Sequence, residues 1–174
     1  MPSPYVIGDL HGFTPQIARL AGMMTYVRQT TLDAVDGLTV EQLDFLLDED
    51  ANSIGALLMH IAAVESAYQP STFELRDDLS RWQYALDLGE GARENIRGQA
   101  LDHYVQTLDE VRRRTLEELA KRDDKWLARE TNFWGGERAN NYFKWFHVFE
   151  DELNHRGQIR VIAKRVRDRY LRAR

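Results

Sequence analysis

Two residues near the end of the chain, Asp151 and His155, have the types and the spacing of a metal-binding pair. They lie four residues apart in a segment with helical periodicity, so their side chains face the same side of a helix, one turn apart. A third candidate, His60, lies far upstream in an amphipathic segment of its own. If the two helices pack together, two imidazoles and one carboxylate form a site for a divalent metal with open coordination positions.

The same spacing also has a purely structural interpretation. An aspartate and a histidine one turn apart can hydrogen-bond to each other, and a histidine at the margin of an apolar stripe can donate to a backbone carbonyl. A buried lone carboxylate is costly unless it is paired or bound to a cation, which favours a ligand at Asp151. Spacing alone therefore leaves a metal site and a hydrogen-bonded pair both open.

Polar residues on the same helical faces are weaker candidates. Glu65 follows the upstream histidine by about one turn and Gln158 follows the downstream one, so either could orient a ligand or a bound water. Glu152 and Arg156 also project toward the apolar face, where we expect them to form an ion pair. His147 is rotated toward the polar side of its helix, and we expect it to face solvent or to support the site indirectly.

The composition limits the chemistry that the chain can carry out. Its length of 174 residues suits a single domain, residues 1–174. It has no cysteine, which excludes disulfides, thiolate–zinc sites and a protein-borne thiol nucleophile, so any thiol chemistry must use the sulfur of a small molecule. The net charge of −5 argues against a nucleic-acid partner. No apolar run reaches the ~18 residues of a membrane span, and no signal peptide is visible, so we expect a cytoplasmic protein without a membrane partner.

Helical periodicity dominates the segments that must position these residues. Apolar residues recur at three- and four-residue steps, and the expected helices are 15–36, a short one after 39, 53–68, 92–122, and one from 140 into the 160s. Residues 1–13 are expected to form an N-terminal arm, 123–139 a loop or small hairpin, and 167–174 a basic, frayed and solvated C-terminal tail. Four long amphipathic helices with few strands predict an all-α four-helix bundle.

Three segments in order resemble the DinB/YfiT-like superfamily of helical-bundle proteins, including its DUF664-type members. They are LTVEQL at 38–43, SIGALLMHIAAVE at 53–65 and HRGQI at 155–159. Their order and spacing match over roughly residues 14–166. None of the three is highly specific by itself, but the three in this order are.

The resemblance implies an up-down-down-up bundle, a homodimer, and a divalent metal, nickel or zinc, held by His60, Asp151 and His155. The family's middle ligand is most often a histidine, and this chain has Asp151 there. Related proteins are similar to thiol-dependent transferases that use mycothiol, bacillithiol or glutathione-like thiols on a small-molecule substrate, or to hydrolases. The alternative is a non-catalytic metal-binding or dimerisation module linked to stress response.

Overall fold

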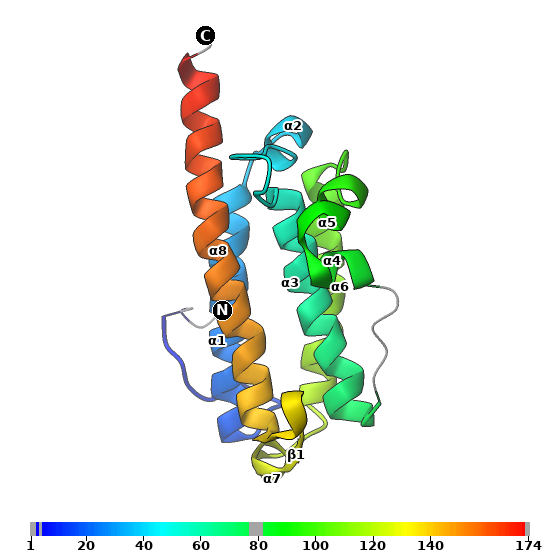
Figure 1. The fold of residues 1–174 in the computed structure, drawn as a ribbon. Helices are drawn as coiled ribbons and strands as arrows, with labels where there is room; N and C mark the ends of the chain where they lie inside the picture. Colours follow the sequence, from blue (N-terminus) through cyan, green and yellow to red (C-terminus); the bar gives the residue numbers. More distant parts are fainter. Residues whose placement is uncertain (1–2, 4, 77–81, 173–174) are drawn as a thin grey trace.

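Four long helices form the body of the molecule in the computed structural model, which describes residues 3, 5–76 and 82–172. In Figure 1, α1 and α8 run from the end that carries α7 and β1 toward the other end, and α3 and α6 run the opposite way. The strands are confined to a small hairpin, so the all-α class is confirmed. The long helices are α1 (Pro15–Val35), α3 (Ile54–Gln69), α6 (Leu101–Leu119) and α8 (Asn141–Arg172).

The predicted helix starts have the expected capping chemistry. Pro15 occupies the first turn of α1, where its missing N–H costs nothing. The Ser53 hydroxyl accepts from the backbone N–H of Ala56 at the start of α3. Thr39 and Gln42 form a reciprocal capping box at the short helix α2 (Val40–Leu43). Local capping interactions therefore fix where α3, the helix that carries His60, begins.

The predicted helix over 92–122 is wrong, because the structure has two helices there, α5 (Gly89–Asn95) and α6 from Leu101. Gly98, between them, has a φ of 73°, which interrupts a right-handed helix and is open mainly to glycine. The predicted end of the helix over 53–68, just before Pro70, is confirmed, because α3 ends at Gln69. A wider π-helical turn, Pro70–Glu74, continues α3 past the proline, which cannot donate to a regular α-helical ladder.

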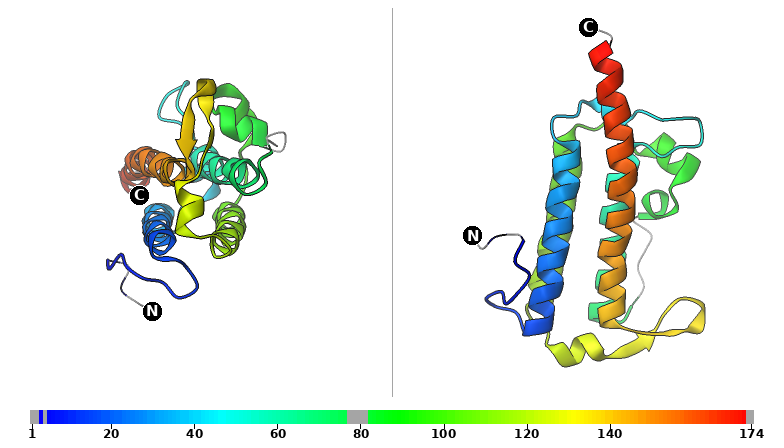
Figure 2. Two further views of the ribbon diagram at one scale, coloured as in Figure 1. Left: turned by 90° about the horizontal axis from the view of Figure 1, so that it is seen from below. Right: turned by 90° about the vertical axis from the view of Figure 1, so that its left-hand side faces the viewer.

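The segment expected as a loop or small hairpin contains a hairpin and a short helix. Strand β1 (Glu130–Asn132) pairs antiparallel with β2 (Arg138–Asn140), and α7 (Asp124–Ala128) precedes them. Gly135 and Gly136, at the tip, have φ values of 65° and 81°. A further short helix, α4 (Gln83–Asp87), lies against α3. Figure 2 shows the hairpin at the end of the bundle where α8 begins.

Two apolar clusters fill the bundle, and a charged layer separates them along all four long helices. Each helix contributes one buried ionised side chain to this layer, which we call the charged quartet: Arg28, Glu65, Arg112 and Glu152. The predicted pair of Glu152 with Arg156 is wrong. Glu152 instead accepts from Arg28 at 2.9 Å, and Arg156 donates to the Thr30 hydroxyl.

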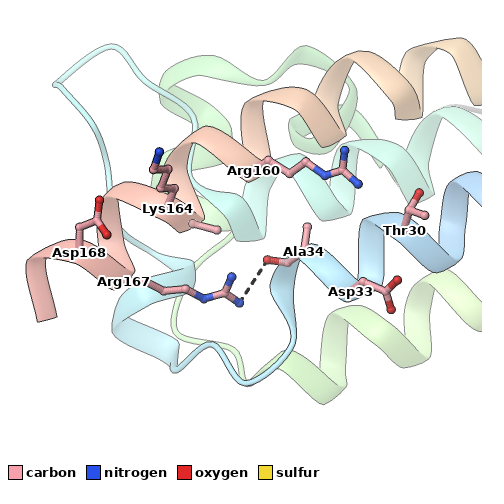
Figure 3. A pocket seen from close by; sticks show the side chains of 8 residues that line it. Thr30, Asp33, Ala34, Arg160, Lys164, Arg167 and Asp168 are labelled. Carbon is pink, nitrogen blue, oxygen red and sulfur yellow. Dashed lines mark hydrogen bonds between the residues drawn. The ribbon is translucent and has the colours of Figure 1, made fainter. Parts of the chain in front are cut away.

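The basic C-terminus is helical and partly packed, so the predicted frayed tail from 167 is wrong for the residues that the structure describes. Arg167 donates to the backbone carbonyls of Ala34 and Asp36, at the C-terminal end of α1 (Figure 3). The guanidinium of Arg169 lies over the Phe45 ring, 5.5 Å from its centroid. These cations therefore complement the negative end of α1 as well as that of their own helix. Residues 173–174 lie outside the described residues.

No helix in the described part of the chain combines the length and the apolar character that crossing a membrane requires.

Candidate metal centre

The structure brings the three predicted ligands together. His60 comes from α3, and Asp151 and His155 come from α8, which packs against α3. One potential ligand atom from each side chain lies within 4.8 Å of the other two. The two imidazole rings meet edge to face, with centroids 4.6 Å apart. The helices thus place two imidazoles and one carboxylate around a single point.

The orientation of His60 is fixed by a backbone carbonyl. Its Nδ1 lies 2.7 Å from the carbonyl oxygen of Ala85 in α4. A carbonyl only accepts, so Nδ1 carries the proton and donates. In the neutral imidazole this leaves Nε2 as the lone-pair nitrogen, and it lies 3.7 Å from Asp151 Oδ2. A histidine held by its other nitrogen is the usual arrangement of a metal ligand.

Asp151 is a shielded carboxylate between the two histidines. Its Oδ1 lies 3.4 Å from His155 Nε2, whereas Oδ2 is buried and has no hydrogen-bond partner in the described structure. Burial alone would raise the pKa of Asp151, but the neighbouring imidazoles of His155 and His60 outweigh burial and hold the pKa of this carboxyl well below its usual range. Burial alone would lower the pKa of His60. The Asp151 carboxylate and the Ala85 carbonyl outweigh burial, so the pKa of His60 is raised.

These observations fit a divalent cation. The ionised Asp151 supplies negative charge, and its second oxygen lacks a proton donor. Imidazole nitrogen and carboxylate oxygen are ligands that zinc and nickel accept. Three protein ligands leave a position for water or substrate. The donor set therefore can hold such an ion through His60 Nε2, the Asp151 carboxylate and a ring nitrogen of His155.

A cavity of about 540 Å³ adjoins this site, and both His60 and Asp151 line it. Its volume lies in the range of pockets that bind small molecules. Apolar groups from three elements make up much of the wall: Val64, Ala67, Leu86 and Phe133. Hydroxyl, amide and imidazole groups complete it: Tyr68, Ser71, Asn132 and His147. The cavity can therefore hold a small, mostly uncharged molecule against the candidate metal ligands.

Two of these residues were missed or left undecided by the sequence analysis. His147 was expected to face solvent or to support the site indirectly; it lines the cavity, and its Nδ1 lies 3.1 Å from Glu150 Oε2. Tyr68 lies two helical turns after His60 on the same face, a spacing that could have found it. Burial, followed by the charge of Asp151, raises the pKa of Tyr68, so its hydroxyl stays protonated at neutral pH.

The two weaker candidates have their partners elsewhere. Glu65 is fully buried, and its carboxylate accepts from Arg28 and Arg112 in the charged quartet. Gln158 is exposed on α8 and lines a different, open pocket with Leu47 and Val161. For Glu65 the reason is rotation, because one turn is 3.6 residues and an offset of five residues moves the side chain away from the face that carries His60. Gln158 stays on the side of α8 that carries Asp151, but it lies almost two turns farther along the helix. The contacts of Glu65 therefore place it in the charged quartet and not beside the candidate ligands.

A second surface pocket, of about 370 Å³, lies between α1 and α8 (Figure 3). Its lining includes Arg160, Lys164 and Arg167 together with Asp33 and Asp168. The acidic groups offset the basic ones, and Arg167 is engaged by α1 carbonyls. None of the predicted site residues lines it.

Comparisons with known proteins place this geometry in a family. A family model described as Mycothiol-S-transferase matches residues 19–168, a span that includes all three candidate ligands. A solved structure described as a conserved protein from Enterococcus faecalis is 16% identical with a TM-score of 0.64. That alignment covers 84% of this chain and 94% of the other, and it shows a shared fold. No curated protein matches the sequence. The chain belongs to the mycothiol-S-transferase family, which confirms the predicted DinB/YfiT-like superfamily.

Proposed function

We propose that this protein is a divalent-metal-dependent thiol transferase. It would join the sulfur of a small thiol, mycothiol or a related compound, to a small electrophilic acceptor. His60, Asp151 and His155 would hold the ion, nickel or zinc. The observation that carries the proposal is the ionised, buried carboxylate with a free oxygen between two imidazoles, beside a cavity of about 540 Å³. Membership in a family described by S-transfer supports the choice of reaction.

The residues of the chain have separate tasks in such a reaction. A bound divalent ion would act as a Lewis acid that lowers the pKa of a thiol. The chain has no cysteine, so the sulfur must enter with the substrate. The apolar residues Val64, Leu86 and Phe133 would bind the acceptor and exclude water. The protonated hydroxyl of Tyr68 can donate a hydrogen bond to an oxygen or a leaving group of the acceptor.

Two alternatives use the same ligands. A hydrolase would take water in place of the thiol, and a non-catalytic module would hold the metal without turnover. A small-thiol transferase would work in the cytoplasm, where such thiols stay reduced. The experiment must therefore separate thiol transfer, hydrolysis and binding alone.

The test is a thioether assay on metal-stripped protein reconstituted with Zn²⁺ or Ni²⁺. Mycothiol, bacillithiol, glutathione and cysteine are each offered with monochlorobimane, and p-nitrophenyl acetate tests hydrolysis. We expect metal-dependent thioether formation that falls to background in His60→Ala and His155→Ala. His103→Ala, an exposed histidine on α6, is the matched control and should retain activity.

Full activity in His60→Ala would contradict the proposal. Ester hydrolysis without thioether formation would favour the hydrolase. A metal-loaded protein that is silent in both assays would favour the non-catalytic module.

A further inference from the structure

A buried lysine joins α8 to the hairpin. Lys144 lies in the first turn of α8 and is only 2% exposed. A buried ammonium group is costly unless acceptors replace its water. Its Nζ donates to the Thr131 hydroxyl at 2.6 Å and to the Asn132 carbonyl at 2.8 Å. Nζ also lies 5.6 Å from the centroid of the Phe133 ring. One side chain thus contacts three consecutive residues of the hairpin.

The same stretch of hairpin forms a wall of the cavity at the metal centre. Asn132 and Phe133 line that cavity together with His60 and Asp151. The Phe133 ring also meets Phe143 of α8 edge to face, with centroids 5.6 Å apart. The position of this wall therefore depends on how firmly the hairpin is attached to α8.

The hairpin cannot hold that position by its own ladder. Each strand has three residues, and a two-stranded hairpin is marginally stable in water. At the base of the hairpin, the backbone N–H of Asn141 donates to the backbone carbonyl of Arg129 at 3.2 Å. Toward its tip, the Lys144 ammonium of α8 donates to the hairpin at Thr131 and Asn132. Lys144 is thus placed to secure the part of the hairpin that faces the cavity.

We propose that Lys144 is a positioning residue that fixes the β1–β2 hairpin as a wall of the acceptor cavity and thereby sets which acceptors bind. The inference rests on the proposed function for the identity of the ligand as an acceptor. The attachment of the hairpin itself stands on the Lys144 contacts. A flat, uncharged acceptor would pack against Phe133, whose ring is held between Lys144 and Phe143.

The test compares three variants. Lys144→Met keeps the apolar stem of the side chain but removes the ammonium donors. Thr131→Val removes one acceptor of the Lys144 ammonium at nearly constant volume. This variant tests the same attachment if Lys144→Met fails to fold. Lys164→Met is the matched control, because Lys164 is an exposed lysine of the same helix.

Four quantities are measured on each protein. They are amide hydrogen exchange over residues 130–140, binding of the uncharged fluorophore 1-N-phenylnaphthylamine, KM and kcat with monochlorobimane, and Zn²⁺ affinity. In Lys144→Met we expect faster exchange in the hairpin and weaker fluorophore binding. We expect KM to rise roughly tenfold, the size of effect that the loss of a charged hydrogen bond produces. The values of kcat and Zn²⁺ affinity should stay close to wild type, as should every value in Lys164→Met.

Hairpin exchange and fluorophore binding at wild-type levels in Lys144→Met would overturn the inference. A parallel loss of Zn²⁺ affinity would also overturn it, because the lysine would then support the whole site. If the wild-type protein forms no thioether, the proposed function fails. Hydrogen exchange and fluorophore binding still decide the role of Lys144 in that case.

Discussion

The chemistry of the candidate centre depends on which nitrogen of His60 carries its proton. The Ala85 carbonyl accepts from Nδ1, so Nε2 is directed at Asp151 and away from the backbone. A metal ligand of the opposite tautomer would need the imidazole to turn and leave the carbonyl of α4 without its donor. The short helix α4 therefore takes part in the site without supplying a ligand.

We predict the Nδ1–H tautomer for His60 in the Zn²⁺-loaded protein at neutral pH. Long-range ¹H–¹⁵N correlation spectra of uniformly labelled protein distinguish the two tautomers, and His60→Ala assigns the signal. A proton on Nε2 would show that this nitrogen does not bind the metal.

At this scale the sequence predicted the ligands better than their surroundings. Asp151 and His155 were found because a four-residue step in a long helix fixes their relative position. The Ala85 carbonyl was not found, because none of the expected helices covers residues 83–87, where α4 lies. For His147 the sequence left solvent and indirect support of the site both open, since the periodicity of one helix cannot show that a distant hairpin covers its polar face.

At the scale of elements, the charged quartet fixes how α3 and α8 meet. Glu65 of α3 and Glu152 of α8 both accept from Arg28 and Arg112, which come from α1 and α6. The same two helices carry the candidate ligands, with His60 five residues before Glu65 and Asp151 next to Glu152. A network of this kind, in which directional bonds link all four helices, can set the register between them.

Arg112→Met is predicted to lower the free energy of unfolding by about 3–5 kcal/mol, because it leaves two carboxylates with one remaining guanidinium in the interior. Arg113→Met is the control, since the neighbouring Arg113 is exposed and forms a surface pair with Glu117. Urea denaturation of the metal-free proteins measures both. Equal stability of the two variants would show that the quartet does not hold the bundle.

The quartet also predicts a pH dependence. Burial alone would raise the pKa of Glu65, but Arg112 and Arg28 outweigh it and lower the pKa in the folded state. A depressed folded-state pKa stabilises the protein above the unfolded value of about 4.3, and this stability is lost as the pH falls through the folded value. The unfolding free energies of wild type and Glu65→Gln should therefore differ most near neutral pH and converge in acid.

Denaturation curves between neutral and acidic pH measure this difference. Glu94→Gln, on the exposed surface of α5, is the control and should follow the wild type. A constant difference between wild type and Glu65→Gln across the range would mean that the carboxylate charge is not what stabilises the quartet.

The long helices could be predicted because their apolar periodicity and caps are local, as at Thr14–Pro15 and Ser53. The interruption at Gly98 was missed because one helix was expected over the whole of 92–122. The π-helical turn after Gln69 was missed because a proline normally ends a helix, and here Pro70 begins a wider turn. The quartet was missed for a different reason. Its four members lie on four helices, and only their packing reveals that each guanidinium finds two carboxylates.

At the scale of the whole molecule, the bundle separates stability from chemistry. The apolar clusters and the quartet occupy its interior, while the metal centre and the cavity lie at one side, under the hairpin and α4. The family match over residues 19–168 covers all four long helices. The homodimer implied by the resemblance stays a prediction.

The central claim is that His60, Asp151 and His155 bind one divalent ion. Asp151→Asn tests it against a simple hydrogen-bonded pair, because asparagine keeps the shape and an acceptor oxygen for His155 but loses the charge. The most direct measurement is calorimetric titration of metal-stripped protein with Zn²⁺. We predict one ion per chain in wild type and in His103→Ala. In Asp151→Asn and His155→Ala we expect an affinity at least about 100-fold lower, beyond what the loss of a supporting residue costs. Undiminished binding in these two variants, or no stoichiometric binding in the wild type, would contradict the account.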